Sequence, residues 1–388
     1  MNKTLTLMLT DLCNCDCRYC YQKVSSKPKM GNLNLNYIEL LDNLLIEFNT
    51  IQFFGGEPLV AENFIFELDS HIDNLINTHY LSSKPEYIFS SNLVELSTKF
   101  KLFLKKLSEE GTIFHFIITI DGNKHIHDKN RIFHNGNGTY QKILNNYHFL
   151  INHNMPCVDN IYVVYNSAHY QNNVSLQDCI EDIHKNFPTV PYITFNREGC
   201  FDETKISESF FFNQKYTLMD KIFNDILNEK KEYKNCIPFF KKELLYMASS
   251  LSDEDSNRKK CIFEGKKLSI IPNGDIYMCV DYYYAGELPI AKLDQTASLT
   301  KTLDNYTLSN NIKFDQCQNC SVRTLCRYCP RLIDTTNICN QNKKYYTMIL
   351  SYLKQIYSNS HLLRYFFNYS ELSNGILFLF YKYLRDFK

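Results

Sequence analysis

Ten of the 15 cysteines in this 388-residue chain fall into two groups, three in the first and seven in the second, whose spacing could bind metal. Cys13, Cys17 and Cys20 form a Cys-x3-Cys-x2-Cys pattern. Three such thiolates would bind a 4Fe-4S cluster with one iron left free for chemistry, because a complete cluster takes four protein ligands. Cys15 does not fit this spacing pattern and is interpreted as a spare thiol. Zinc binding by some of these four cysteines is the alternative.

The second group lies within residues 259–341, where helical periodicity gives way to cysteine, glycine and proline. We therefore expect a metal-stabilised domain rather than one organised by a large apolar core. Two zinc sites are the alternative on spacing alone, because paired Cys-x2-Cys elements are common zinc ligands. The seven cysteines are Cys261, Cys279, Cys317, Cys320, Cys326, Cys329 and Cys339.

The elements that must position the first group alternate between β-rich runs and stretches of helical period. This alternation predicts an α/β fold with parallel strands and crossover helices, and six units favour a partial, open TIM-like (βα)6 barrel. We expect the strands at Thr4–Thr10, Thr50–Phe54, Tyr87–Ser90, Phe114–Ile120, Ile161–Tyr165 and Tyr192–Phe195.

Polar residues follow the expected strands where a (βα) barrel collects its active site. Gly55-Gly56-Glu57-Pro58 comes directly after the second strand, where paired glycines would let the backbone approach a ligand and a carboxylate could bind an amine. Alone, this segment also reads as an ordinary turn. Ser91 and Asn92 follow the third strand, Thr119 and Asp121 lie at the end of the fourth, and Arg131 comes ten residues later.

Together these motifs resemble the radical S-adenosylmethionine (SAM) superfamily, in which reductive cleavage of SAM at the free iron yields a 5′-deoxyadenosyl radical. The resemblance implies that Cys13, Cys17 and Cys20 ligate the cluster. It also implies that Tyr19 packs beside the adenine, that the glycine-rich turn holds the methionine amino group, and that Thr119, Asp121 and Arg131 surround the ribose and carboxylate. The expected SAM-binding set is Tyr19, Gly55, Gly56, Glu57, Pro58, Asn92, Thr119, Asp121 and Arg131.

The second group resembles a SPASM domain, an extension of peptide- and protein-modifying radical SAM enzymes that carries two auxiliary 4Fe-4S clusters. The resemblance implies three clusters in all. It assigns three ligands to the first auxiliary cluster, Cys261, Cys279 and Cys329, and four to the second, Cys317, Cys320, Cys326 and Cys339. The first auxiliary cluster therefore has either an open iron or a fourth ligand such as Cys236. The more ordinary interpretation of Cys236 is a buried structural thiol, as for Cys157, Cys179 and Cys200.

We expect four segments: a radical SAM barrel (1–207), a helical linker (208–258), the SPASM domain (259–341) and C-terminal helices (342–388). Lys plus Arg and Asp plus Glu each total 42, so nothing in the charge favours a nucleic-acid partner. The longest apolar run, Ile376–Tyr381, is far short of the ~20 residues that span a bilayer. With no export signal visible, a cytoplasmic location is expected.

The resemblance implies an enzyme that modifies a ribosomally made peptide by forming a thioether or carbon-carbon crosslink, or by epimerisation. An anaerobic sulfatase maturase that makes formylglycine is the alternative within this class, and a non-catalytic, zinc-organised binding module is the alternative outside it. The expected partners are the peptide or protein substrate, a separate leader-binding protein, and an electron donor such as flavodoxin or ferredoxin. No residue is assigned to the substrate chemistry itself.

Overall fold

The structure is a computed structural model that describes residues 3–23, 29–155, 158–198, 201, 203–251, 267–294, 320–322, 325 and 336–386. The chain divides into two compact units. As far as their residues are described, unit 1 is formed by Met1–Thr119, His127–Asn160 and Cys261–Asn311, and unit 2 by Ile120–Ile126, Ile161–Lys260 and Ile312–Lys388.

All six predicted strands are present, and the α/β prediction is confirmed. They are β1 (Thr4–Thr10), β2 (Thr50–Gly55), β3 (Glu86–Ser90), β4 (Phe114–Thr119), β5 (Val158–Tyr165) and β6 (Tyr192–Arg197). The described strands follow the order β6-β5-β4-β3-β2-β1-β7-β8-β9, and β1 to β4 pair with one another in parallel. Parallel pairing places the carboxyl ends of these four strands at one edge of the sheet.

Unit 1 is held together by an apolar core on one face of its strands, because Leu7, Phe53 and Phe89 are register partners across β1 to β3. Leu5, Leu7 and Leu9 of β1 are fully buried, as expected for a central strand of a parallel sheet. Phe89 of β3 stacks on Phe53 of β2 with 5.2 Å between ring centroids, and all of these side chains are at most 1% exposed. Each such side chain contributes roughly 1.5–3 kcal/mol by leaving water.

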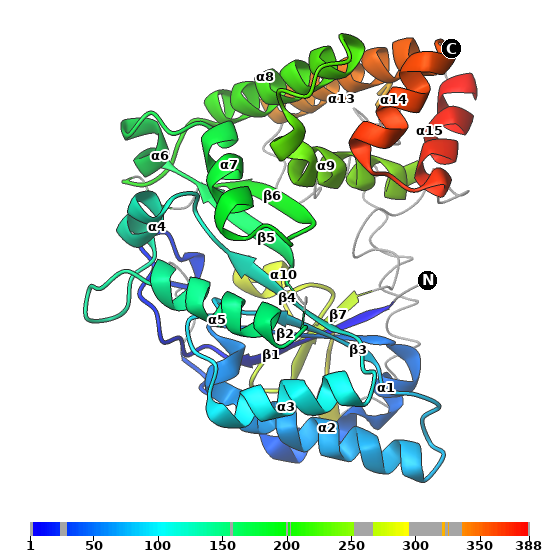
Figure 1. Cartoon of the computed structure of the whole chain (residues 1–388). Helices are drawn as coiled ribbons and strands as arrows, with labels where there is room; N and C mark the ends of the chain where they lie inside the picture. The colour runs from blue at the N-terminus through cyan, green and yellow to red at the C-terminus, as the bar shows by residue number, and fades with distance from the viewer. Residues whose placement is uncertain are drawn as a thin grey trace. The chain divides into compact units, whose positions relative to one another are not determined.

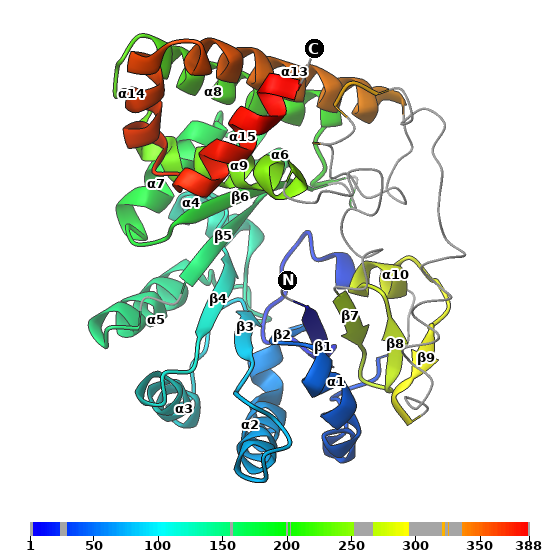
Figure 2. The ribbon, with the colours of Figure 1, turned by 90° about the vertical axis from the view of Figure 1, so that its right-hand side faces the viewer.

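Three helices, α1 (Asp42–Glu47), α2 (Glu62–Asn77) and α3 (Thr98–Glu109), lie along one face of β1 to β4 (Figure 2). In α3 the apolar residues Phe100, Leu104 and Leu107 recur every three to four positions and are buried. The Ser97 side chain accepts a hydrogen bond from the Phe100 N–H and so begins the helix. α5 (Tyr140–Asn152) also belongs to unit 1.

A buried carboxylate links these helices to the sheet. Asp69 of α2 is 2% exposed and accepts hydrogen bonds from the Lys84 and Lys106 ammonium groups at 2.8 and 2.7 Å. It also accepts one from the Tyr87 hydroxyl at 2.9 Å, at the start of β3. This network lies at the amino end of β3, the end opposite to the polar residues that follow the strands.

The cysteine-rich region adds strands to the same sheet. β7 (Lys267–Ile270) pairs in parallel with β1, and β8 (Asp275–Tyr277) and β9 (Ala291–Lys292) continue outward in antiparallel pairing. The sequence predicted this segment as part of a following domain. Its strand β7 supplies the backbone partners that β1 would otherwise lack on that side. α10 (Val280–Tyr284) follows β8.

Unit 2 contains a group of long helices (Figure 1). α13 (Thr336–Tyr357), α14 (Ser360–Ser370) and α15 (Asn374–Asp386) confirm the predicted C-terminal helices, and they pack against α8 (Glu208–Leu227) and α9 (Ile237–Leu251). The Phe223 ring of α8 stacks on Tyr352 of α13 at 4.9 Å. α6 (Ser167–Gln171) and α7 (Leu176–Asn186) also belong to this unit, and α4 (Lys124–Asn130) is divided between the two units.

The predicted segment boundaries can be compared with the ends of the described helices. α8 begins at Glu208, where the helical linker was expected to begin. α13 runs through the expected boundary between residues 341 and 342, and the boundary at 258/259 lies outside the described residues. The four-segment division therefore stays a prediction.

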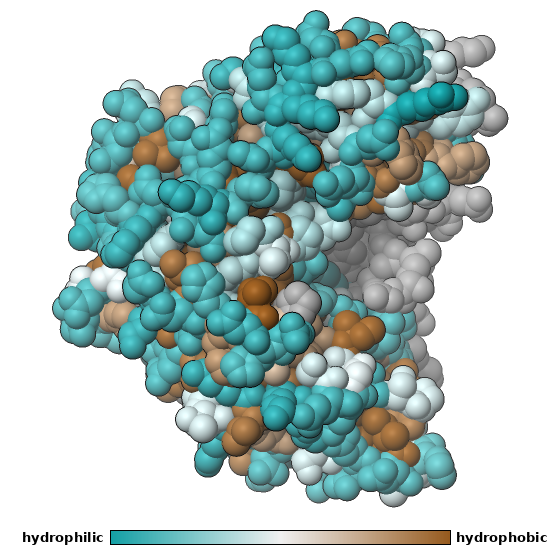
Figure 3. All heavy atoms as spheres, in the orientation of Figure 1, coloured by the Kyte–Doolittle hydropathy of each residue, from teal (hydrophilic) through white to brown (hydrophobic). Residues whose placement is uncertain are grey.

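The face shown in Figure 3 is mainly hydrophilic, with hydrophobic residues in small separate groups. Among the described helices, none is long and apolar enough to cross a bilayer.

Candidate functional site

The first cysteine group lies in the loop that follows β1, and this loop is paired with the segment that carries Arg131. The Asp16 N–H donates to the Ile132 carbonyl at 2.7 Å, and the Arg18 N–H donates to the Asn130 carbonyl at 2.9 Å. These bonds join two segments more than 100 residues apart in the chain. These hydrogen bonds fix the backbone conformation of the cysteine loop and place it next to the segment that carries the Arg131 guanidinium.

The thiols of this loop affect one another electrostatically. The hydrogen bond from the Cys15 thiol, assisted by the positive charge of Arg131, lowers the pKa of Cys17 to about 6 against the effect of burial. A hydrogen bond from Cys15 also lowers the pKa of Cys13, whereas burial raises the pKa of Cys20. The loop thus favours thiolates at Cys13 and Cys17, and thiolate is the form that binds iron.

These thiols suit a polynuclear cluster, in which each thiolate binds a different iron. Among the described residues, no three His, Cys, Asp or Glu side chains lie close enough to hold one metal ion. Nevertheless Cys13 and Cys17 both raise the pKa of Cys20 through their charge, so the three thiols are neighbours. Soft thiolate donors of this number suit an iron-sulfur cluster.

The paired glycines after β2 allow a close approach of backbone to backbone. A Cβ atom on Gly55 would lie 2.3 Å from the Thr10 carbonyl oxygen, and one on Gly56 would lie 2.2 Å from that of Leu12. Gly55 also has φ +148°, which disfavours any side chain. We expected these glycines to make room for a ligand. In the structure they make room for the start of the cysteine loop.

Glu57 is turned toward protein donors. Its carboxylate is 2% exposed and accepts hydrogen bonds from the Ser91 hydroxyl (2.7 Å), the Asn92 N–H (2.7 Å) and the Leu59 N–H (3.1 Å). Burial raises the pKa of Glu57 to about 7, although these hydrogen bonds and Arg131 favour the charged form. The carboxylate thus ties the ends of β2 and β3 together. An amine bound at this turn would be held by backbone carbonyls, as we propose below.

Gln22, which the sequence analysis did not single out, contacts the same turn. Its Nε2 atom donates to the Gly55 carbonyl at 2.8 Å. Pro58 begins a short 3-10 helix, Pro58–Ala61, and is buried. A side-chain amide two positions after the last cysteine carries no spacing signal, so only the folded loop identifies this contact.

Tyr19 and Arg131 form a buried pair beside the cysteines. Tyr19 is 7% exposed, and its hydroxyl accepts a hydrogen bond from the Arg131 Nη1 atom at 3.1 Å. Thr119 ends β4 and is half-buried. The residues that unit 1 brings together are Cys13, Cys17, Cys20, Tyr19, Gly55, Gly56, Glu57, Asn92 and Arg131.

Asp121 belongs to unit 2 and has structural contacts there. It is fully buried, its Oδ1 atom accepts the Val164 N–H at 3.0 Å, and its backbone carbonyl contacts His169 Nε2 at 3.2 Å. Burial lowers the pKa of His169 to about 4, so this imidazole is neutral and donates the bond. In the structure, Asp121 holds the segments that carry Val164 and His169. A ribose contact by its carboxylate stays a prediction.

Three cysteines of the second group are described. Cys279 precedes α10 in unit 1 and is half-buried, with its Sγ atom 3.7 Å from Asp281 Oδ2. Cys320 and Cys339 are half-buried free thiols of unit 2. The other proposed ligands lie outside the described residues: Cys261, Cys317, Cys326 and Cys329.

The two cysteine-bearing segments of unit 1 approach each other through aromatic rings. Tyr21 follows Cys20, and its ring meets that of Tyr284 of α10 edge to face at 4.9 Å. Burial is the main cause that raises the pKa of Tyr21, and the charges of Asp281, Cys20 and Cys279 raise it further. Cys279 is therefore close to the first cysteine loop, a proximity that no spacing in the sequence indicates.

Of the expected structural thiols, two are described. Cys179 of α7 is fully buried, and Cys236 is 1% exposed at the end of a short 3-10 helix, Lys234–Cys236. Burial raises the pKa of Cys236 to about 12. Cys157 and Cys200 lie outside the described residues.

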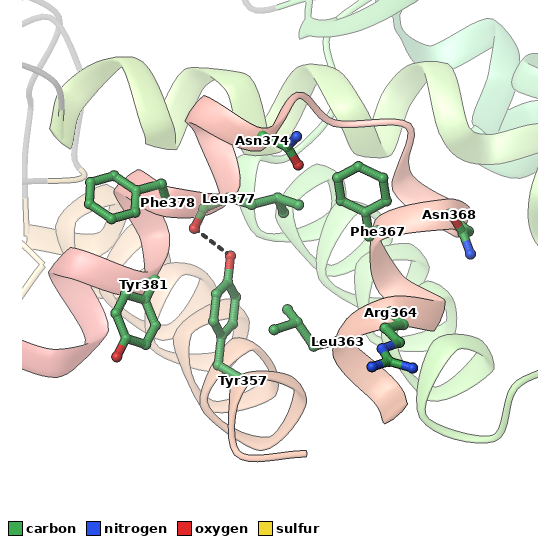
Figure 4. Close-up of a pocket in the computed structure, with 9 residues that line it drawn as sticks. All are labelled: Tyr357, Leu363, Arg364, Phe367, Asn368, Asn374, Leu377, Phe378 and Tyr381. Carbon is green, nitrogen blue, oxygen red and sulfur yellow. Dashed lines mark hydrogen bonds between the residues drawn. The ribbon is translucent and has the colours of Figure 1, made fainter. Parts of the chain in front are cut away.

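A pocket of about 450 Å³ lies among the C-terminal helices of unit 2 (Figure 4). Its lining is mainly aromatic and aliphatic, with Tyr357, Phe367, Leu377 and Phe378 around it and Arg364 as its cation. Its described lining contains no thiol or carboxylate, and it includes none of the predicted site residues that the structure describes.

Known proteins are similar to this chain in sequence and in fold. Residues 7–168 match the radical SAM superfamily. A cysteine-type anaerobic sulfatase-maturating enzyme of Clostridium novyi (strain NT) is 25% identical over 350 residues, which are 84% of this chain and 87% of that protein. The radical SAM cyclopropyl synthase TigE of Paramaledivibacter caminithermalis is 31% identical over 122 residues, 27% of this chain and 25% of that protein.

Two solved structures share the fold. A histidine-tagged form of anSMEcpe with bound AdoMet has a TM-score of 0.67 at 18% identity, and the match covers 89% of this chain and 96% of that one. Streptococcus suis SuiB bound to precursor peptide SuiA has a TM-score of 0.55 at 12% identity, and the match covers 84% of this chain and 71% of that one.

Proposed function

We propose that this chain, which belongs to the radical SAM superfamily through residues 7–168, modifies a ribosomally made peptide with a radical derived from SAM. The observation that carries the proposal is the three-thiol loop of Cys13, Cys17 and Cys20 packed against the glycine turn after β2. A 4Fe-4S cluster bound there supplies the electron that cleaves SAM to methionine and a 5′-deoxyadenosyl radical.

The residues around the cysteine loop bind and orient SAM. The backbone carbonyls of the glycine turn accept the SAM amino group, and Arg131 supplies positive charge for its carboxylate. Tyr19, held by Arg131, gives a fixed aromatic surface for the adenine. Glu57 keeps the turn in place from behind. These groups orient SAM and exclude water, which protects a reactive radical from side reactions.

The preference for a peptide rests on the relatives. One carries the name of a sulfatase-maturating enzyme, another that of a cyclopropyl synthase, and SuiB was solved with a precursor peptide. We propose that the bond formed is a thioether or a carbon-carbon crosslink, or that an epimerised centre results. A separate leader-binding protein and an electron donor of the flavodoxin or ferredoxin type complete the proposal.

Anaerobic reconstitution tests the enzyme assignment. The wild-type chain should acquire the broad visible absorption of iron-sulfur clusters and, with dithionite and SAM, release 5′-deoxyadenosine and methionine. Replacing Cys13, Cys17 and Cys20 together by Ala should abolish this cleavage and leave any iron bound by the second group. A wild-type chain that binds only zinc and leaves SAM intact would end the proposal in favour of a binding module.

Sulfatase maturation is a second candidate, favoured by the relative that matches 84% of this chain. That reaction needs a base to deprotonate the Cys or Ser of the substrate, and Asp281 is exposed beside Cys279. Mass spectrometry after co-expression with the product of a neighbouring small reading frame, and separately with a sulfatase peptide, distinguishes the two. Formylglycine on the sulfatase peptide, lost in Asp281→Asn and accompanied by no change in the small peptide, would reverse the ranking.

We also propose that the first auxiliary cluster, held by Cys261, Cys279 and Cys329, keeps an iron open to a substrate thiol. Cys236 is the competing fourth ligand, and its burial in unit 2 supports a structural role. Cys236→Ala should leave the iron content unchanged, and a cysteine peptide should then alter the cluster spectrum. Loss of one cluster's iron from this variant would refute the open site.

A further inference from the structure

We propose that Asn92 is a positioning residue for the cysteine loop. Its side-chain amide holds the loop at Asn14 and directs a proton toward the sulfurs of Cys13 and Cys15. Of these two sulfurs, Cys13 is the cluster ligand, and the contact with it raises the reduction potential of the bound cluster. This inference rests on the cluster of the proposed function and assigns Asn92 a role other than the SAM contact expected from the sequence.

The hydrogen-bond pattern determines which end of the amide faces the loop. Asn92 Oδ1 accepts the Val94 N–H at 2.9 Å, so the NH₂ end must point the other way. There, Nδ2 lies 2.8 Å from Asn14 Oδ1, 3.4 Å from Cys15 Sγ and 3.8 Å from Cys13 Sγ. One amide proton therefore goes to Asn14, and the other faces sulfur.

The backbone around Asn92 is built to hold this orientation. The Asn92 N–H donates to Glu57 Oε2 at 2.7 Å, which fixes the residue to the glycine turn. Leu93, which comes next, is fully buried and has φ +54°, a left-handed backbone conformation that is strained for a residue with a side chain. The Ser91 hydroxyl and the Asn146 amide hold it there through the Leu93 N–H and carbonyl.

An N–H group directed at a cluster thiolate stabilises the more negative, reduced cluster more than the oxidised one. Removing the Asn92 amide should therefore shift the midpoint potential to more negative values. Loss of support for the turn alone would not have this effect, because it removes no donor from sulfur. The potential thus separates an electrostatic role from a merely structural one.

The experiment compares Asn92→Ala and Asn92→Ser with wild type and with Asn146→Ala. The Ser hydroxyl can still accept the Val94 N–H but is too short to reach the loop. Asn146→Ala weakens the same turn and leaves the amide of Asn92 in place. Each chain is reconstituted anaerobically without SAM or substrate, and iron per chain is measured. The EPR signals are titrated at defined potentials, and the signal followed is the one that is absent when Cys13, Cys17 and Cys20 are all replaced by Ala.

We expect both Asn92 variants to shift to more negative potentials and Asn146→Ala to stay at the wild-type value. If Asn92→Ser is fully loaded with iron and keeps the wild-type midpoint potential, the inference is wrong. It is also wrong if the midpoint potential of Asn146→Ala shifts as much as that of the Asn92 variants. If Asn92→Ala does not fold, Asn92→Ser decides alone. A wild-type chain that takes up no cluster would instead overturn the proposed function, so the two failures are distinguishable.

Discussion

Replacing Gly56 by Ala tests the packing of the glycine turn on the cysteine loop. The new Cβ would lie 2.2 Å from the Leu12 carbonyl oxygen and 2.6 Å from its carbon, where ordinary contacts begin at 3.4 Å. The two backbones would have to separate by about 1 Å. The Gly56 N–H to Thr10 and Glu57 N–H to Leu12 hydrogen bonds, both 2.8 Å, would then be stretched past useful length.

Losing two buried hydrogen bonds costs about 1 kcal/mol each, and the overpacking itself costs about 1–3 kcal/mol. Gly56→Ala should therefore lose about 3–5 kcal/mol of unfolding free energy and bind less iron, because Leu12 leads directly into Cys13. Urea unfolding monitored by circular dichroism measures the first, and iron analysis the second. Gly375→Ala in α15 is the control, since its Cβ meets nothing closer than 4.0 Å and alanine favours helix. A Gly56→Ala chain with wild-type stability and iron would refute this reasoning.

Burial lowers the pKa of His169 from 6.5 to about 4, so between these values the unfolded chain binds a proton that the folded chain does not. The unfolding free energy should therefore fall by about 3 kcal/mol as the pH drops from 6.5 to 4, because of this group. If the unfolding free energy of a His169→Gln chain falls with pH as steeply as that of wild type, the prediction is wrong. Asp69→Ala leaves the buried Tyr87 hydroxyl without its acceptor, while both lysines keep Asp73 and Glu110, and it should cost about 2–3 kcal/mol of unfolding free energy, measured by thermal unfolding. Lys105→Ala, at an exposed pair, should cost under ~1 kcal/mol in the same thermal unfolding measurement. Equal losses would argue against the buried network. Cys279→Ala should lower the iron content per chain by about one cluster, and Cys179→Ala should leave it unchanged. If the iron content is unchanged in both variants, Cys279 is not a cluster ligand.

The strands of the barrel could be predicted because each is a short run of β-branched and aromatic residues bounded by polar turns. β1 was predicted at Thr4–Thr10 and has those bounds. The pairing of β7 with β1 could not be predicted, because a four-residue strand more than 250 residues away carries no signal of which edge it joins. The same limit applies to the C-terminal helices, whose periodicity shows an apolar face and not the partner that covers it.

The site divides in the same way. The spacing of Cys13, Cys17 and Cys20 and the Gly-Gly-Glu-Pro segment were enough to identify the chemistry, because ligand type and local spacing are properties of consecutive residues. Which atoms meet depends on backbone approach and burial. Only the fold shows that the glycines admit the Leu12 backbone, that Glu57 faces Ser91, and that Asn92 turns its amide toward the thiols. Sequence alone thus determined which groups are available, and tertiary structure decided which of them face each other, because hydrogen bonds act over about 3 Å between residues that lie far apart along the chain.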